Sequence, residues 1–388
     1  MFTRPHDPLT MTRGLGRLRG SLKVGQKMIK MLVPVLSLVA LTSCGGAPAG
    51  WTGETETEAG PTLPEGVEGT DSANGSLERY EAKTDNGSGY AESITYDKVK
   101  DEFFVDNLAF DGANSAYTRG TAVRSLGGKE GINTGPYAVY EGPASFPDSA
   151  TGDPITQLQH RAIYAESRNT TASGDARTRF AIVRTGSYVG YGFGGFVYAR
   201  EGTTSIPRPT IANPNEAQGI FTGDYAGIVD YNMSSGMMLS SGDMELVIDF
   251  QDFNDGNTNG DAVRGYVTGR TFYNTAGTDV TDSYLAALNR HLEYTSGGYT
   301  TVPSLVFTIQ PGVTLDNGEI TGSVGNTVRN GLGEAVTNET GSYYAVLAGD
   351  ANTADSEVVG VLVVEHAISD TVTQRETGGF IVYRGANN

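Results

Sequence analysis

The sequence predicts an all-β protein: an eight-stranded antiparallel β-barrel preceded by a smaller β-rich domain. From about residue 76 onward, apolar and polar residues alternate with period two in short segments separated by clusters of Gly, Asn, Asp and Ser. Glycine supplies 53 of the 388 residues, which is typical of chains with many tight turns. Only one segment has the apolar spacing of a helix.

The carboxy-terminal domain, residues 216–388, contains eight predicted strands. Strands of this length and even spacing can close into a barrel filled by its own side chains, and closure removes the exposed sheet edges. The predicted strands cover residues 219–229, 244–253, 263–273, 305–309, 319–324, 343–348, 357–365 and 379–384.

Alternation within these strands predicts which side chains enter the barrel core. Large side chains alternate with glycines in 219–229, which suits the crowded inside of a small barrel. The residues predicted to face inward are Phe221, Tyr225, Met244, Leu246, Ile248, Phe250, Leu305, Phe307 and Ile309.

A second, less regular β-rich domain is predicted over residues 76–210. Its apolar runs cover residues 102–110, 137–141, 161–166, 180–185 and 188–200. Three prolines within 205–214 indicate where one domain gives way to the next. The predicted helix lies in the barrel domain at 282–292, with Thr281 as a candidate N-cap and Leu285, Leu288 and Leu292 on one face.

Composition excludes several classes of protein. One cysteine in the whole chain is incompatible with a disulfide framework, a thiolate zinc site or an iron–sulfur cluster. The formal charge of −18 repels a nucleic-acid backbone. The charge is uneven, because residues 1–43 hold seven basic residues and one acid.

The amino terminus has the order of a secretory signal. Lys23, Lys27 and Lys30 precede an uncharged apolar run over 31–40, which is too short for a permanent transmembrane helix. Leu41, Thr42, Ser43 and Cys44 follow and resemble the bacterial lipobox. The resemblance implies cleavage before Cys44 and lipidation of that residue, so that 1–43 is a lipoprotein signal peptide.

Two questions about this terminus stay open. A plain signal peptide with an incidental cysteine would have the same order of segments, and the true start could be Met1, Met28 or Met31. Residues 44–75 are acidic and contain few aliphatic side chains. Such a segment cannot bury enough apolar surface to offset its ordering entropy, so a disordered tether is predicted there.

An integral outer-membrane barrel would show the same alternation with its faces exchanged. Two features favour a lipid-anchored barrel that does not span the membrane. A lipid anchor would be redundant for a spanning barrel, and residues 384–388 contain no aromatic girdle residue.

Four glycine-punctuated runs carry a resemblance to a known family. They are GIFTGDY at 219–225, SYYAVLAG at 342–349, EVVGVLVVE at 357–365 and ETGGFIVYR at 376–384. Over residues 216–385 the chain resembles the barrel domain of transferrin-binding-protein-B-like bacterial lipoproteins, and the part before it corresponds loosely to their handle domain. The resemblance implies a single-lobed lipoprotein that acts by binding. No segment matches a transferrin-contacting surface.

Two segments match all or part of the consensus sequence of a ligand-binding motif. Gly190, Gly192 and Gly195 match a dinucleotide fingerprint, but a strand rather than a helix is predicted after them, which favours a simple bend. Residues 255–260, from Asp255 to Gly260, match the first half of a calcium loop, although position 12 is Tyr266. An ordinary hairpin loop has the same composition, and both possibilities stay open.

No residue is nominated as catalytic or as a metal ligand. His160, His291 and His366 are far apart in sequence, and packed or surface roles are expected for them. The mature chain has no nucleophile-elbow motif, and carboxylate pairs are common in any acidic chain. The 20 tyrosines suit partner recognition, but aromatic residues are also good strand formers.

These observations predict a non-catalytic, lipid-anchored binding protein of the outer membrane, facing the periplasm or the cell exterior. We expect a monomer without a cofactor, whose partner is a protein or a small solute. Two alternatives stay open: a structural envelope lipoprotein without a dedicated ligand, and a hydrolase with an unrecognised site.

Overall fold

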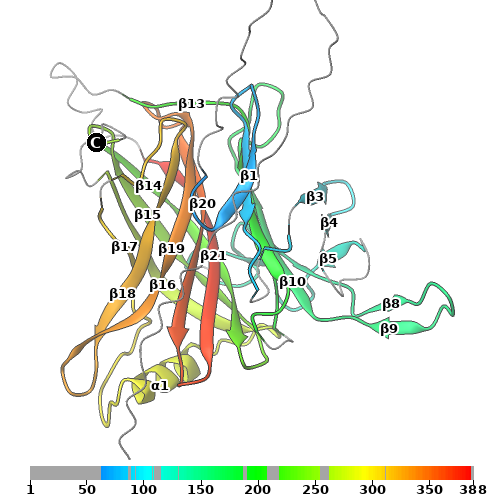
Figure 1. Ribbon diagram of the computed structural model, residues 1–388, viewed down its shortest axis with the longest axis vertical. Helices are drawn as coiled ribbons and strands as arrows, with labels where there is room; N and C mark the ends of the chain where they lie inside the picture. The colour runs from blue at the N-terminus through cyan, green and yellow to red at the C-terminus, as the bar shows by residue number, and fades with distance from the viewer. Residues whose placement is uncertain are drawn as a thin grey trace, which may run out of the picture. The chain divides into compact units, whose positions relative to one another are not determined.

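Strands make up nearly all of the regular structure, as the sequence predicts. The computed structural model describes residues 63–385, except 86–88, 92, 107, 109–114, 130, 187–189, 208–217, 254–261 and 311. In this part of the chain, one helix accompanies two large sheets and a two-stranded hairpin (Figure 1). The all-β fold class is confirmed.

Eight consecutive strands form a closed antiparallel barrel. Each strand pairs with the next, and the last returns to pair with the first. All eight predicted segments are therefore confirmed as barrel strands. The strands are β14 (Gln218–Asn232), β15 (Met238–Asp249), β16 (Val263–Asn274), β17 (Leu305–Phe307), β18 (Glu319–Arg329), β19 (Ala335–Asp350), β20 (Glu357–Ala367) and β21 (Thr373–Arg384).

The barrel is filled by its own side chains. Eight of the nine residues predicted to face inward are at most 1% exposed and belong to one core cluster. Within this cluster, the rings of Phe307 and Tyr343 stack with their centroids 3.8 Å apart. Ile309 is the exception: it is 45% exposed, because β17 ends at Phe307 and the alternation ends with it.

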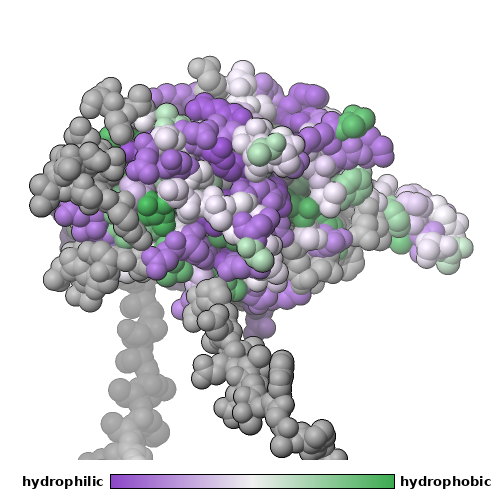
Figure 2. All heavy atoms as spheres, turned by 90° about the horizontal axis from the view of Figure 1, so that it is seen from above, coloured by the Kyte–Doolittle hydropathy of each residue, from purple (hydrophilic) through white to green (hydrophobic). Residues whose placement is uncertain are grey.

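Polar side chains lie on the outer surface of the barrel. Thr222, Glu245, Arg264 and Ser323 are exposed and alternate with the buried residues of their strands. Figure 2, seen from above, shows mainly hydrophilic residues with scattered hydrophobic ones among the coloured atoms of that face. A membrane-spanning barrel has an apolar band outside and a polar interior, whereas the interior of this barrel is mainly apolar.

The second sheet is formed by the chain that precedes the barrel. Each of the five apolar runs predicted in this part contains a strand of the sheet. In spatial order the strands are β1 (Val67–Asp71), β2 (Leu77–Glu81), β12 (Gly194–Arg200), β11 (Thr178–Thr185), β10 (His160–Glu166), β7 (Tyr137–Glu141), β5 (Tyr117–Arg119), β4 (Glu102–Val105) and β3 (Ile94–Asp97).

Four short strands complete the set. They are β6 (Ser125–Leu126), which pairs with β7, the hairpin of β8 (Ser145–Pro147) and β9 (Pro154–Thr156), and β13 (Thr204–Ser205), which pairs in parallel with β19.

The prediction of a disordered tether over residues 44–75 is wrong for residues 67–71. Val67–Asp71 forms β1 and pairs antiparallel with β2 in register, Val67 opposite Glu81. The segment has few apolar residues, but backbone pairing with β2 orders it, and Val67 is buried. A composition argument based on apolar burial cannot detect this edge strand.

The second sheet packs on the outside of the barrel. Ala226, Ile228 and Val359 face outward from their barrel strands and share a core cluster with Phe180 and Phe196 of the second sheet. Gly379 permits this close approach, because a Cβ atom there would lie 2.3 Å from the ring of Phe180. The facing sides of the two sheets therefore form one hydrophobic cluster between them, separate from the cluster inside the barrel.

Buried ion pairs reinforce this contact. Arg79 of β2 donates to both carboxylate oxygens of Glu319 in β18 at 2.6 and 2.8 Å. Arg184 of β11 binds Glu81 and also donates to the hydroxyl of Thr377 in β21 at 2.9 Å. Both arginines are fully buried. Separating the sheets would break the ion pair between Arg79 and Glu319 and the hydrogen bond between Arg184 and Thr377.

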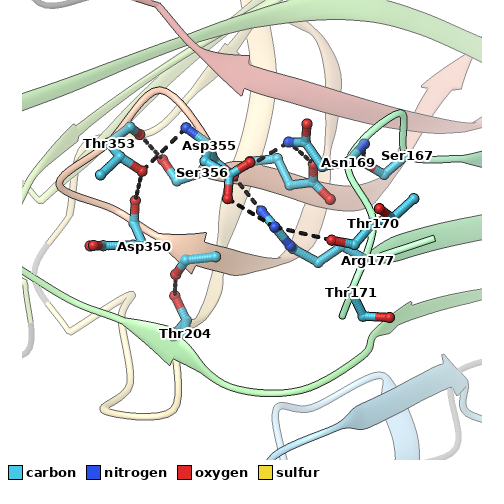
Figure 3. A network of polar contacts seen from close by, with 12 residues as sticks. Ser167, Asn169, Thr170, Thr171, Arg177, Thr204, Asp350, Thr353, Asp355 and Ser356 are labelled. Carbon is cyan, nitrogen blue, oxygen red and sulfur yellow. Dashed lines mark hydrogen bonds and ion pairs between the residues drawn. The ribbon is translucent and has the colours of Figure 1, made fainter. Parts of the chain in front are cut away.

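A polar network joins the loop between β10 and β11 to the turn between β19 and β20 (Figure 3). Ser167 and Asn169 donate to a carboxylate oxygen of Glu357, both at 2.6 Å. The guanidinium of Arg177 binds the carboxylate of Asp355 at 2.9 Å. The network fixes the second sheet to the barrel at a further point.

The predicted helix is present as α1 (Thr281–His291). Leu285, Leu288 and Leu292 are buried as expected. The N-cap prediction is wrong, because Val280 occupies that position and makes no side-chain cap. The hydroxyl of Thr281 instead accepts a hydrogen bond from the backbone N–H of Phe272 in β16 at 2.9 Å, which attaches the helix to the barrel.

Candidate binding face

The barrel wall is interrupted beside β17. This strand has three residues, whereas its neighbours β16 and β18 have twelve and eleven. Pro303 precedes it, and because proline has no N–H to donate, regular pairing does not continue there. A groove of about 440 Å³ lies over the interruption. Its lining includes Ser304, Val306 and Thr327.

A second groove, of about 380 Å³, adjoins the first. Ser323 lines both grooves. The lining of the second also includes Glu65, Leu315 and Tyr344, and the Tyr344 hydroxyl donates to the Glu65 carbonyl at 3.1 Å. We call the surface formed by the two grooves and the neighbouring Ile309 the β17–β19 face.

The β17–β19 face is almost uncharged, although the chain carries a net charge of −18. Glu65 and Glu339 are the charged residues among those that line the two grooves. Val306, Ile309 and Leu315 are 38%, 45% and 37% exposed. Exposed apolar side chains in such a setting can be covered by a partner without removing charges from water.

A buried ion cluster supports the face from inside the barrel. Arg270 donates to Glu339 at 2.6 Å and to Glu376 at 2.8 Å, and all three side chains are at most 1% exposed. Burial alone would lower the pKa of Arg270, but the two carboxylates outweigh that effect and raise it well above its ordinary value.

The same cluster closes the interrupted wall. Arg270 donates to the Pro303 carbonyl at 2.7 Å, and Asn326 donates to the Ser304 carbonyl at 3.3 Å. These contacts satisfy backbone acceptors that a longer β17 would have paired. The side-chain cluster therefore replaces part of the sheet.

The carboxylates of the cluster are saturated by donors. Tyr225 and Ser240 donate to Glu376 at 2.8 and 2.6 Å, and Asn326 donates to Glu339 at 2.6 Å. Glu339 also lines the larger groove, so the interior cluster meets the surface at this carboxylate. The donors therefore hold both carboxylates in fixed positions beneath the face.

The sequence motifs have different outcomes. Leu41, Thr42, Ser43 and Cys44 lie outside the described residues, as does the 255–260 loop, so lipidation and calcium binding stay predictions. The bend interpretation of the 190–195 motif is confirmed, because the chain bends over residues 190–193 and a strand, β12, begins at Gly194 within the motif. The neighbouring ring of Tyr191 stacks under the guanidinium of Arg375, 4.0 Å from its centroid.

The histidines are closer in space than in sequence. The rings of His291 and His366 meet edge to face with centroids 5.2 Å apart. His160 is fully buried, and His366 is 5% exposed, which confirms packed roles for both. Among the described residues, no group of three His, Cys, Asp or Glu side chains has a metal-binding arrangement.

His160 should make stability depend on pH. Its Nδ1 lies 3.1 Å from the Leu158 carbonyl oxygen, and burial lowers the pKa of the ring to about 4. Because this folded-state pKa is below the unfolded value, the unfolded chain gains a proton first as pH falls through 6.5, and stability falls until about pH 4. Between pH 7 and 5 the loss should be about 2 kcal/mol.

The measurement is urea unfolding at both pH values for the wild type and for His160→Gln, which cannot titrate. Between pH 7 and 5, we expect His160→Gln to lose about 2 kcal/mol less stability than the wild type. Equal losses in the two proteins would show that His160 does not cause the pH dependence.

The sequence patterns predict neither the ion cluster nor the grooves. Glu339 and Glu376 do continue the inward phase of their strands, but the predicted strands begin only at 343 and 379. Arg270 is turned inward by a β-bulge at Gly269, whose φ is +61° and which shifts the register between β15 and β16. Pro303 before a short apolar run was the available signal for the interruption.

Comparisons with known proteins place the chain in no family. No family model matches it, and no curated protein matches it significantly. Among solved structures, it is similar to a double mutant of Transferrin Binding Protein B from Haemophilus parasuis Hp5, with a TM-score of 0.32 and 9% identity over 82% of this chain. The match covers 53% of that protein, so this chain spans about half of its length. Likeness at this level does not establish family membership.

Within the described residues, no helix combines the length and the apolar character needed to cross a membrane.

Proposed function

We propose that this chain is a lipid-anchored binding protein of the bacterial cell envelope, which holds a protein or a small solute on the β17–β19 face without changing it chemically. The main support for this proposal is the face itself. It is a nearly uncharged, grooved surface with exposed apolar side chains, in a strongly acidic chain.

The architecture favours a ligand held outside the barrel. The core side chains fill the interior. The buried Arg79–Glu319 ion pair and the hydrogen bond from Arg184 to Thr377 fix the second sheet on the wall. A rigid body loses little conformational entropy on binding, which favours affinity. The face is therefore preorganised for recognition.

The anchor is the second part of the proposal. Cys44, the sole cysteine, follows the apolar segment at the position that a lipobox requires. Several acyl chains hold a protein on a membrane far more firmly than one chain does. The outer membrane is the proposed location, because Gly45 rather than Asp follows the cysteine.

Site-specific photocrosslinking in cells that express the full chain tests the binding face. A benzophenone amino acid at Thr327, which is exposed in the larger groove, should capture one discrete partner. The matched control is Thr222, an exposed threonine on the outside of β14. We expect no such product from the control position.

Identical products at the two positions, or none at either, would contradict the proposed face. Crosslinks confined to general envelope material would favour a structural lipoprotein. Turnover of ester or glycoside substrates by the purified chain, abolished by a single Ser, Asp or Glu substitution, would favour the hydrolase.

A further inference from the structure

A separate, mainly apolar pocket lies between α1 and the end of the barrel. Its volume is about 240 Å³. From the helix it is lined by residues that include Ser283 and Ala287, and from the barrel by Tyr231, Met238 and Gln374. None of these residues lines the grooves of the β17–β19 face, so the pocket is distinct from the proposed binding face.

The sequence of α1 explains why a space remains there. Tyr284 and Leu288 anchor the helix in the apolar cluster at the barrel end, and the ring of Tyr284 packs on Phe272 at 4.2 Å between centroids. Ser283 and Ala287 are one turn apart, at i and i+4, and therefore lie on the same side of the helix. Both side chains are too short to fill the gap.

The pocket carries a small set of polar groups. His366 and Gln374 are 5% and 3% exposed, and both line the pocket. The Nδ1 atom of His366 lies 2.8 Å from the Asn338 carbonyl oxygen. Because a carbonyl only accepts hydrogen bonds, Nδ1 carries the proton of the neutral ring and Nε2 is the acceptor.

These features define the ligand class. Burial lowers the pKa of His366, which keeps the ring neutral at pH 7, and no Asp, Glu, Lys or Arg lines the pocket. An apolar cavity of about 150 Å³ holds benzene, so this larger pocket has room for a substituted ring or a fused bicycle. An acceptor and an amide in an apolar lining suit one polar group on such a molecule.

We propose that the pocket under α1 binds a small uncharged aromatic molecule that carries one hydrogen-bond donor, of the phenol or indole class. The apolar lining covers the ring, and His366 or Gln374 accepts the donor. Indole is a suitable probe, and indene, which has the same shape without the N–H, is its matched control.

Nuclear magnetic resonance of the full chain with labelled methionine methyl groups tests the proposal. Millimolar indole should shift the methyl signal of Met238, which lines the pocket, and leave that of Met233, which is 59% exposed, unchanged. Indole should bind about two- to tenfold more tightly than indene, as expected for one buried hydrogen bond.

Two helix variants locate the site. Ala287→Leu should fill the pocket and weaken indole binding at least tenfold, whereas Ala286→Leu, on the exposed side of α1, should leave binding unchanged. Wild-type affinity in Ala287→Leu would overturn the proposal. If Ala287→Leu does not fold, the Met238 signal of the wild type decides: no shift at millimolar indole overturns the proposal.

Discussion

Replacing Arg270 with methionine should lower the free energy of unfolding by about 3–5 kcal/mol, the loss typical of a buried ion pair deprived of one partner. Arg270 is the cation between Glu339 and Glu376, and all three side chains are buried. Its removal leaves two carboxylates in the core and the Pro303 carbonyl without its donor. Urea unfolding at pH 7 measures the change.

Arg264→Met is the matched control, because Arg264 lies on the same strand but is exposed. We expect its effect to stay within about 0.5 kcal/mol, as for surface substitutions in general. Adding Glu339→Gln and Glu376→Gln to Arg270→Met should recover part of the loss, since the unpaired charges are then gone. A single Arg270→Met variant as stable as the control would show that the cluster does not hold the barrel.

Cys44→Ala should transfer the protein from the membrane fraction to the soluble fraction. Under the proposed anchoring, the substitution removes the thiol that accepts the lipid, and with it the acyl chains whose burial holds the protein on the bilayer. The folded body should be unaffected, because residue 44 precedes its first strand at Val67. Fractionation measures the location, and thermal unfolding checks the fold.

Ser43→Ala is the control for this experiment. Alanine keeps a small residue before the cysteine, so processing and membrane association should continue as in the wild type. A Cys44→Ala protein that remains membrane-bound would contradict the lipid anchor.

Much of the barrel could be predicted from the sequence, because its strands are amphipathic. Met244, Leu246 and Ile248 alternate with polar residues, and a half-buried strand needs that pattern. The same logic missed the start of β15, where Ser240, Ser241 and Gly242 pair with β14 without apolar alternation. Backbone pairing extends the strand there, and the hydroxyls of Ser240 and Ser241 form hydrogen bonds with Glu376 and the Gly128 carbonyl.

The candidate site and the packing around α1 could be predicted less well, for three physical reasons. The bulge at Gly269 reverses the alternation and turns Arg270 inward, which no period-two pattern reveals. The grooves result from a strand that is too short, and the sequence shows only Pro303 beside it. The contact between His291 and His366 depends on where α1 docks, a tertiary fact without a local signal.

Mass spectrometry of the mature protein purified from native membranes tests the proposed anchored state most directly. The proposal predicts a chain that begins at Cys44 and carries both a thioether-linked lipid and an acylated amino group. A chain that begins at another residue, or an unmodified Cys44, would contradict it.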